Sequence, residues 1–344
     1  MKLNEKIFSK AALFSFIVLI ALWGCGSDES SGPVPGTKEP DRQHPDKKIT
    51  VGINTTIKSA NIILAKELGL FKKQGLDVEL VVEQTGADLI ELLYQGKVDL
   101  VTIPEQLAAF AALHRNDFQI LTVINRNQTQ ELIARKDHGI ADIKDLKGKK
   151  IALTKKSGSP YWLNRMLVYN GLSIDDVQLL NAQPLDQIRM LDEGTVDALI
   201  CWLPYTYKAR EVLNKNAVWL KANLGQDMYW IVVGMKKWIH EDPVVSTKFL
   251  RAVQQATNFI ETDPEQTKKI LSVFLKLEKE KIDLEWPRHR FSLELPQNLI
   301  LAMEQEVQWK IGQIKEEKNI PNFLNYIYWD ALQKLNPDAV TIVH

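Results

Sequence analysis

The sequence has few of the residues that build metal centres and disulfide frameworks. Its two cysteines, Cys25 and Cys201, are 176 positions apart, and its six histidines form no His-x-His or His-x-x-x-His pair. Zinc sites and disulfide-rich folds depend on cysteines and histidines that recur at short, regular spacings. We therefore expect no metal, no cofactor and no disulfide framework in this chain.

The chain also lacks an excess of charge of either sign. Its 43 lysines and arginines balance its 43 aspartates and glutamates, so the formal net charge at pH 7 is zero. Nucleic-acid-binding proteins usually present a basic surface, and we expect no nucleic-acid partner. The length of 344 residues is sufficient for two domains.

The apolar run near the N-terminus is too short to cross a membrane. It extends over 13 residues, from Ala11 to Trp23, and follows three lysines. This pattern is typical of a secretory signal, and we expect the signal to comprise residues 1–24. Residues 25–47 are rich in Ser, Gly, Pro and charged residues, which indicates a disordered tether.

The signal ends in a sequence that resembles the bacterial lipobox. Leu22 lies three positions before Cys25, and the small residue Gly24 directly precedes it. The resemblance implies cleavage before Cys25 and attachment of a lipid to its sulfur. The protein would then be a membrane-anchored lipoprotein of the cell envelope that faces the periplasm or the cell exterior. An ordinary signal peptide with an incidental cysteine is the alternative.

A helix-to-strand pattern occurs twice in the remaining chain. Residues 93–99 (Leu-x-x-Gly-x-Val-Asp) recur as residues 191–197, at an offset of 98 positions. In each copy the glycine separates the end of a helix from the start of a strand. Two copies are too few for a solenoid. They favour two similar α/β lobes that face each other across a cleft.

Polar loops follow two of the predicted strands. They are residues 54–56 (Asn-Thr-Thr) and residues 155–160 (Lys-Lys-Ser-Gly-Ser-Pro), and each precedes a predicted helix. In open α/β sheets ligands bind at the carboxyl ends of the strands, where helix N-termini also attract anions. The alternative is that the Thr and Ser side chains only cap the helices.

Aromatic residues follow the strand of the second repeat. Trp202 and Tyr205 are candidates for an aromatic wall of the cleft, because aromatic faces suit flat rings, alkyl chains and cations. Tyr229 and Trp230 are candidates to extend this wall, whereas we expect Trp162 in the core.

The last hundred residues show the spacing of amphipathic helices. Apolar residues recur at intervals of three and four, which predicts helices over residues 244–261, 264–277, 296–315 and 321–335. The charged run at residues 278–281 is typical of a solvated helix face.

Several short motifs occur in a fixed order between residues 48 and 240. They are Glu67-Leu68-Gly69-Leu70-Phe71 with Gly75-Leu76, Leu93-x-x-Gly96-x-Val98-Asp99, Asp145-Leu146-Lys147-Gly148-Lys149, Gly171-Leu172, Gly194-x-Val196-Asp197-Ala198 and Trp202-x-Pro204-Tyr205. In this ordered set the chain resembles the solute-binding proteins of bacterial ABC importers, in the nitrate, sulfonate, taurine and thiamine-precursor group.

The resemblance implies a type II periplasmic-binding-protein fold. In this α/β fold, two Rossmann-like lobes enclose a ligand cleft and are joined by two crossover strands. Lobe 1 would comprise residues 48–130 and 230–344, which include the C-terminal helices, and lobe 2 would comprise residues 131–229. The ligand-binding residues that the resemblance implies are Asn54, Thr55, Thr56, Thr85, Gly86, Thr102, Pro104, Glu105, Ser157, Gly158, Ser159, Trp202, Pro204, Tyr205 and Asp227.

The resemblance predicts a binding protein and not an enzyme. The protein would be a monomer that captures a small organic or anionic solute, such as a sulfonate, taurine, nitrate or a thiamine precursor. It would deliver this solute to the permease and ATPase subunits of an ABC importer. An enzyme of the dehydratase type on the same fold is one alternative, with Glu105 and Asp227 as an acid–base pair. A lipoprotein that senses the solute for a membrane receptor is another.

Overall fold

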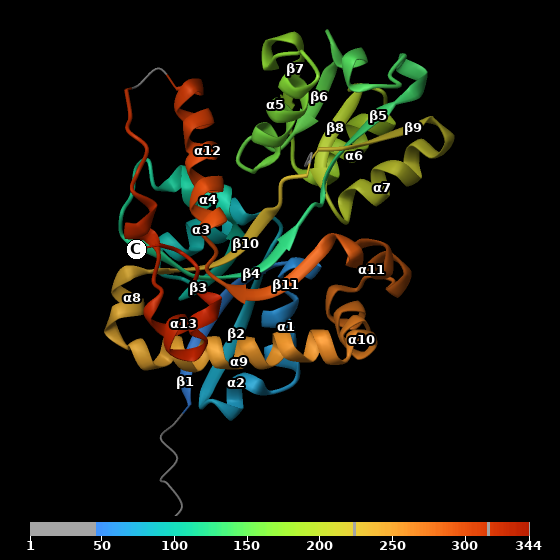
Figure 1. The fold of residues 1–344 in the computed structure, drawn as a ribbon. Coiled ribbons are helices and arrows are strands. Elements are labelled where there is room, and N and C mark those ends of the chain that lie inside the picture. Colours follow the sequence, from blue (N-terminus) through green and yellow to red (C-terminus); the bar gives the residue numbers. More distant parts are fainter. Residues whose placement is uncertain (1–45, 223–224, 315–316, 344) are drawn as a thin grey trace, which may run out of the picture. The chain divides into compact units, whose positions relative to one another are not determined.

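The computed structural model describes residues 46–222, 225–314 and 317–343. The predicted signal, the predicted lipidation site Cys25 and nearly all of the predicted tether lie outside these residues. The described residues belong to one compact unit. This unit contains two β-sheets, both covered by helices (Figure 1). No described helix is both long and apolar enough to cross a lipid bilayer.

The first sheet has six strands in the order β11-β4-β10-β3-β1-β2. Strand β1 pairs in parallel with β2 and β3, whereas β10 is antiparallel to β3 and β4, and β11 is antiparallel to β4. The strands are β1 (Lys47–Asn54), β2 (Leu76–Glu83), β3 (Leu100–Pro104), β4 (Phe118–Asn127), β10 (Met228–Met235) and β11 (His289–Glu294).

The second sheet has five strands in the order β7-β6-β8-β5-β9. Strand β6 pairs in parallel with β7 and β8, and β5 is antiparallel to β8 and β9. The strands are β5 (Gln130–Arg135), β6 (Lys150–Leu153), β7 (Gln178–Asn181), β8 (Ala198–Trp202) and β9 (Ala217–Lys221). The chain therefore enters this sheet directly after β4 and returns to the first sheet at β10.

Helices from two parts of the chain cover the first sheet. They are α1 (Ala60–Glu67), α2 (Leu70–Lys73), α3 (Gly86–Tyr94), α4 (Glu105–Ala111), α8 (Lys236–Glu241), α9 (Pro243–Thr262), α10 (Pro264–Leu275), α11 (Lys279–Glu285), α12 (Gln297–Gln313) and α13 (Asp330–Leu335). The 20-residue helix α9 lies against α1, α2 and α13 (Figure 1). The second sheet packs with α5 (Ser159–Tyr169), α6 (Pro184–Asp192) and α7 (Tyr205–Leu213).

The repeated sequence pattern is also a repeated structure. Gly96 and Gly194 both end a helix with a positive φ, 65° and 71°, which glycine adopts without steric cost. The aspartate three residues later then holds a neighbouring strand. The carboxylate of Asp99 accepts the backbone N–H of Thr50 in β1 at 2.7 Å, and that of Asp197 accepts the N–H of Lys150 in β6 at 2.7 Å.

The C-terminal region differs from its prediction in two places. Residues 321–335 form no single helix but a short 3₁₀ turn (Phe323–Tyr326) and α13, because the N–H of Tyr328 between them donates to the carbonyl of Ile120 in β4. Strand β11 was not predicted. It occupies the edge of the first sheet and alternates apolar residues with charged or polar ones over only six positions, a weak signal for a strand.

The contact between α2 and α9 offers a test of how the C-terminal helices stabilise the first sheet. The rings of Phe71 and Phe249 are both buried and stack with centroids 5.1 Å apart. We predict that Phe249→Ala lowers the free energy of unfolding by about 3–5 kcal/mol, because it removes buried apolar surface and leaves a cavity. Urea denaturation measures this loss. Val273→Ala on α10, where the side chain is 81% exposed, should change stability by less than about 0.5 kcal/mol. Equal effects of the two substitutions would contradict the prediction.

Candidate functional site

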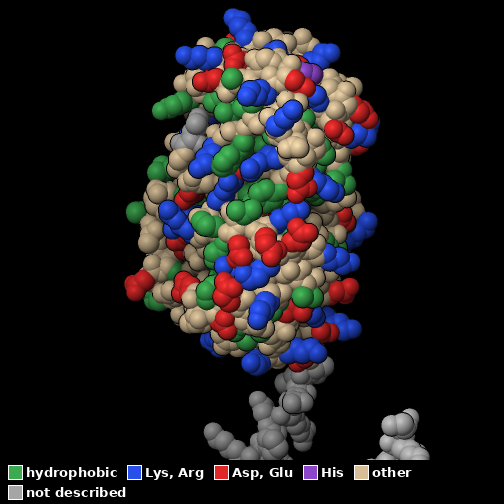
Figure 2. All heavy atoms as spheres, turned by 90° about the vertical axis from the view of Figure 1, so that its right-hand side faces the viewer, with side chains coloured by type: hydrophobic (Ala, Val, Ile, Leu, Met, Phe, Trp, Pro, Cys, Tyr) green, Lys and Arg blue, Asp and Glu red, His purple; other side chains and the backbone are tan. Residues whose placement is uncertain are grey.

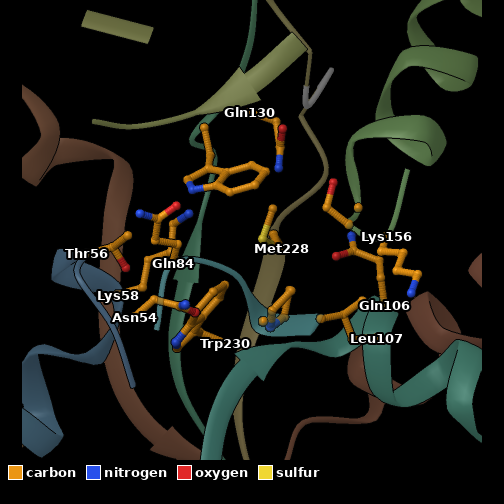
Figure 3. A pocket seen from close by; sticks show the side chains of 15 residues that line it. Asn54, Thr56, Lys58, Gln84, Gln106, Leu107, Gln130, Lys156, Met228 and Trp230 are labelled. Carbon is orange, nitrogen blue, oxygen red and sulfur yellow. The ribbon is translucent and has the colours of Figure 1, made fainter. Parts of the chain in front are cut away.

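A pocket lies where strand ends of the two sheets approach each other. Together with the open solvent at its mouth, it contains about 420 Å³ of space that no protein atom fills. The described residues that line it are Asn54, Thr56, Lys58, Gln84, Gly86, Pro104, Gln106, Leu107, Gln130, Lys156, Ser157, Gly158, Trp202, Met228 and Trp230. Figure 3 shows Asn54, Lys58 and Trp230 on one side of this space and Gln106 and Lys156 on the other.

The pocket wall contains seven of the fifteen predicted ligand-binding residues. They are Asn54, Thr56, Gly86, Pro104, Ser157, Gly158 and Trp202. The first four come from the first sheet and its loops, and the last three from the second. The other eight are not on the wall of this pocket: Thr55, Thr85, Thr102, Glu105, Ser159, Pro204, Tyr205 and Asp227.

Local structure explains why several predicted side chains are elsewhere. Thr85 caps α3 and accepts the N–H of Asp88 at 3.2 Å. The hydroxyl of Thr102 lies 2.8 Å from that of Ser59, inside the first sheet's core. Ser159 is buried in the first turn of α5. Thr55 is exposed.

The remaining residues of this group lie around α7 and the two connections between the sheets. Pro204 precedes α7 after a cis peptide bond, and the Tyr205 ring packs edge-on against Trp202 at 6.0 Å between centroids. Asp227 accepts a hydrogen bond from Gln128 at 2.8 Å. Because alternate residues of an extended segment face opposite sides, Met228 and Trp230 line the pocket while Asp227 faces away.

Seven residues of the wall were absent from the predicted ligand-binding residues and the predicted aromatic wall: Lys58, Gln84, Gln106, Leu107, Gln130, Lys156 and Met228. Trp230, a candidate to extend the aromatic wall, lines the pocket, whereas the other candidate, Tyr229, does not. Strand alternation is the sequence signal that finds Met228 and Trp230 together. Gln84 directly precedes the predicted residue Thr85, and Lys156 belongs to the predicted loop 155–160. Nothing in the sequence distinguishes Lys58 or Gln106 from an ordinary surface side chain on a helix.

Several buried polar atoms of the wall have no hydrogen-bond partner among the described residues. They are Oδ1 of Asn54, Oγ1 of Thr56 and both Oε1 and Nε2 of Gln106. Each of these residues is at most 3% exposed. Buried polar atoms in folded proteins nearly always have a partner, and an orphaned one costs about 1–3 kcal/mol. A small polar solute in the pocket would supply these partners.

The two sides of the pocket come close together at Gly158. A Cβ atom at this position would lie 2.8 Å from Oε1 of Gln106, on α4 of the other sheet's layer. Real Cβ contacts are longer, so a larger residue here would displace the end of the Gln106 side chain. The loop before α5 therefore contacts α4 beside the pocket.

A family model described as NMT1/THI5 like matches residues 56–267 of the chain. The chain belongs to this family. A putative aliphatic sulfonates-binding protein of Bacillus subtilis (strain 168) is 26% identical over 281 residues, which cover 80% of this chain and 81% of that protein. A 4-amino-5-hydroxymethyl-2-methylpyrimidine phosphate synthase of Aspergillus parasiticus is 25% identical over 221 residues, which cover 60% of this chain and 64% of the synthase.

The solved structures with a similar fold include the alkanesulfonate-binding protein SsuA of Xanthomonas axonopodis pv. citri, bound to MOPS. The TM-score is 0.72 at 20% sequence identity, and the alignment covers 82% of this chain and 98% of that one. This likeness confirms the predicted periplasmic-binding-protein fold, and the family match confirms the predicted resemblance.

Behind the pocket wall of this NMT1/THI5-like protein, two carboxyl groups are buried together. Glu105 begins α4 and Glu306 lies on α12, and both side chains are fully buried without an ion pair to any described cation. Burial raises the pKa of Glu105 to about 8, and burial together with the charge of Glu105 raises the pKa of Glu306 well above its ordinary value. The pair therefore holds a proton at neutral pH.

The placement of Glu105 also corrects the predicted acid–base pair. Glu105 points away from the pocket toward α12, and Asp227 lies on the other side of its strand. Neither carboxyl group lines the pocket, so the two do not face a common ligand there.

The buried carboxyl pair predicts an unusual dependence of stability on pH. Between about pH 5 and pH 8 the folded protein keeps a proton that the unfolded chain releases, since an unfolded glutamate has a pKa of about 4.3. The free energy of unfolding should therefore fall as the pH rises through this range. We predict a smaller fall in Glu105→Gln, measured by urea denaturation at pH 5, 6, 7 and 8.

Glu261→Gln is the matched control, because Glu261 is exposed on α9. It should keep the wild-type dependence on pH. If Glu105→Gln and Glu261→Gln show the same dependence, the two buried carboxyl groups do not share a proton.

Proposed function

We propose that this protein is the solute-binding component of an ABC importer. It captures a small organic or anionic solute in the pocket and delivers it to a membrane permease with its ATPase. The observation that supports this proposal most directly is the group of orphaned polar atoms in the pocket wall. The binding proteins among its relatives point to the same function, since their names specify aliphatic sulfonates and alkanesulfonate.

The proposed mechanism is closure of two lobes around the solute. We assign residues 48–130 and 230–344 to one lobe and residues 131–229 to the other, because the chain changes sheets near these positions. A solute that bonds to Asn54 and Thr56 on one side and packs against Trp202 on the other favours the closed form. The permease then recognises the closed form. In this proposal the protein is a monomer, anchored at the outer surface of a membrane through a lipid on Cys25.

An enzymatic function has weaker support, although one relative is named as a synthase. Cys201 directly precedes the wall residue Trp202, so its thiol is the candidate nucleophile beside the pocket. It is 1% exposed, and burial raises its pKa to about 12. The thiol is therefore protonated at neutral pH and poorly nucleophilic. The described pocket wall contains no histidine, aspartate or glutamate, so Lys58 and Lys156 are its only groups that could act as an acid or base.

A thermal-shift screen of the full chain tests the proposal. The panel comprises sulfonates, taurine, nitrate, pyrimidines and aromatic carboxylates. A solute at about 100 times its dissociation constant should stabilise the folded protein by about 2.7 kcal/mol. We predict that Trp202→Ala abolishes this shift, because it removes apolar wall from the pocket, whereas Trp219→Ala on β9 preserves it. A shift that survives Trp202→Ala would contradict binding in this pocket.

The solute recovered after incubation separates binding from catalysis. A chemically unchanged solute is expected of a delivery protein. A converted solute would overturn the proposed function in favour of an enzyme on the same fold.

A further inference from the structure

Lys58 is a buried cation in the pocket wall. It belongs to the 3₁₀ turn Ile57–Ser59 that follows β1, and it is 1% exposed. Its ammonium nitrogen lies 5.1 Å from the centroid of the Trp230 ring, and no described residue forms an ion pair with it. Figure 3 shows Lys58 next to Asn54 and Trp230, at the edge of the solute space. A buried ammonium without a counter-ion is energetically costly.

The acidic groups around Lys58 are already engaged elsewhere. Among the titratable groups around it, Glu285 of α11 has the largest influence on its pKa. Cys201 of β8 and Glu105 of α4 also contribute, but both titrate above neutral pH, and His289 of β11 is the nearby base. Nε2 of His289 lies 3.2 Å from Oε1 of Glu285. Burial lowers the pKa of His289, so this contact is a hydrogen bond and not an ion pair at neutral pH. Glu105 shares a proton with Glu306. Burial consequently lowers the pKa of Lys58 to about 8, in spite of these groups.

The charges on the pocket wall have only one sign. Among the described lining residues, Lys58 and Lys156 are cationic, and there is no aspartate or glutamate. Lys156 is exposed to solvent, so Lys58 is the only one of the two whose charge is desolvated. The wall thus provides a buried partner for one negative charge and none for a positive charge.

The orphaned oxygens of the wall require a neutral donor. Oδ1 of Asn54 and Oε1 of Gln106 can only accept hydrogen bonds, whereas the hydroxyl of Thr56 can also donate one and Nε2 of Gln106 can only donate. A hydroxyl or amide N–H on the solute satisfies an amide oxygen without bringing a second positive charge near Lys58. Met228, Leu107 and the two tryptophans leave an apolar surface for a short chain or a flat group.

We propose that Lys58 is the charge anchor of this pocket and sets its specificity. The solute is a small, singly charged anion whose acidic group accepts hydrogen bonds from Lys58 and Thr56. It also bears a neutral hydrogen-bond donor, and it has no ammonium group. This inference rests on the proposed solute-binding function and narrows it, since it separates simple and hydroxylated sulfonates or carboxylates from zwitterions such as taurine.

Three sulfonates that differ in one substituent provide the test. Ethanesulfonate has a hydrogen, 2-hydroxyethanesulfonate a hydroxyl and taurine an ammonium group at the same carbon. Isothermal titration of the full chain, purified in detergent, gives their dissociation constants. We expect 2-hydroxyethanesulfonate to bind more tightly than ethanesulfonate, and taurine to bind at least tenfold more weakly than either. Taurine binding as tightly as the other two would overturn the inference.

Two lysine variants distinguish a direct contact between Lys58 and the solute from general electrostatic attraction. Lys58→Met should weaken binding of 2-hydroxyethanesulfonate at least 30-fold, and Lys156→Met should weaken it less than threefold. The melting temperature of the unliganded Lys58→Met protein should be equal to or higher than that of the wild type, because the variant no longer buries a charge. Unimpaired binding by Lys58→Met, or equal losses in both variants, would overturn the inference.

The pH dependence of binding tests Lys58 without changing it. Above pH 8 the unliganded lysine loses its proton, so the dissociation constant for the anion should rise by up to about tenfold per pH unit between pH 8.5 and 9.5. The measurement is made in the Glu105→Gln background, because Glu105 also titrates near pH 8. A constant affinity over this range would contradict the anchor.

A neutral probe distinguishes failure of this inference from failure of the proposed function. The probe is 4-amino-5-hydroxymethyl-2-methylpyrimidine. One outcome is that the probe binds tightly, its affinity is unchanged by Lys58→Met, and the sulfonates do not bind. In that case the solute-binding function stands and the proposed specificity for an anion is wrong. If neither the sulfonates nor the neutral probe bind, both the proposed function and the inference are overturned.

Discussion

The position of the pocket depends on two half-buried carboxylates at the opposite ends of the strands. Asp99 binds the backbone of β1 beside β3, and Asp197 binds the backbone of β6 beside β8. Each carboxylate fixes the register of two parallel strands at their first residues. The register in turn determines which residues are adjacent at the ends of the strands. In the first sheet these ends bring Asn54 and Pro104 together, and in the second the end of β8 brings Trp202 to the pocket.

Much of this architecture could be predicted from the sequence because its causes are local. The repeated pattern is a short one, in which a glycine ends a helix and an aspartate precedes an apolar strand. Its repetition shows that the chain has two similar halves. The loops at residues 54–56 and 157–158 could be located for the same reason, since strand, loop and helix follow one another directly in the chain. Strand β11 could not, because its position depends on pairing with β4, more than 160 residues earlier.

The composition of the pocket wall was harder to predict than its location. Glu105 and Gln106 are adjacent, and both precede the apolar residues of α4. The side chain of Glu105 lies beside Glu306 on α12, whereas the side chain of Gln106 lines the pocket. Which of the two faces the solute is decided by a helix that begins nearly 200 residues later. Lys58 is a similar case, since its burial results from Trp230 and α11 and not from its own neighbours.

Solute binding in this pocket has a consequence for the amount of protein in the cell. A bound solute raises the stability of the folded molecule by mass action. Proteases degrade unfolded chains, so a stability difference of 1–2 kcal/mol changes protein abundance several-fold. Empty molecules should therefore be degraded faster than loaded ones. The supply of solute would in this way regulate how much binding protein is present, without any change in its synthesis.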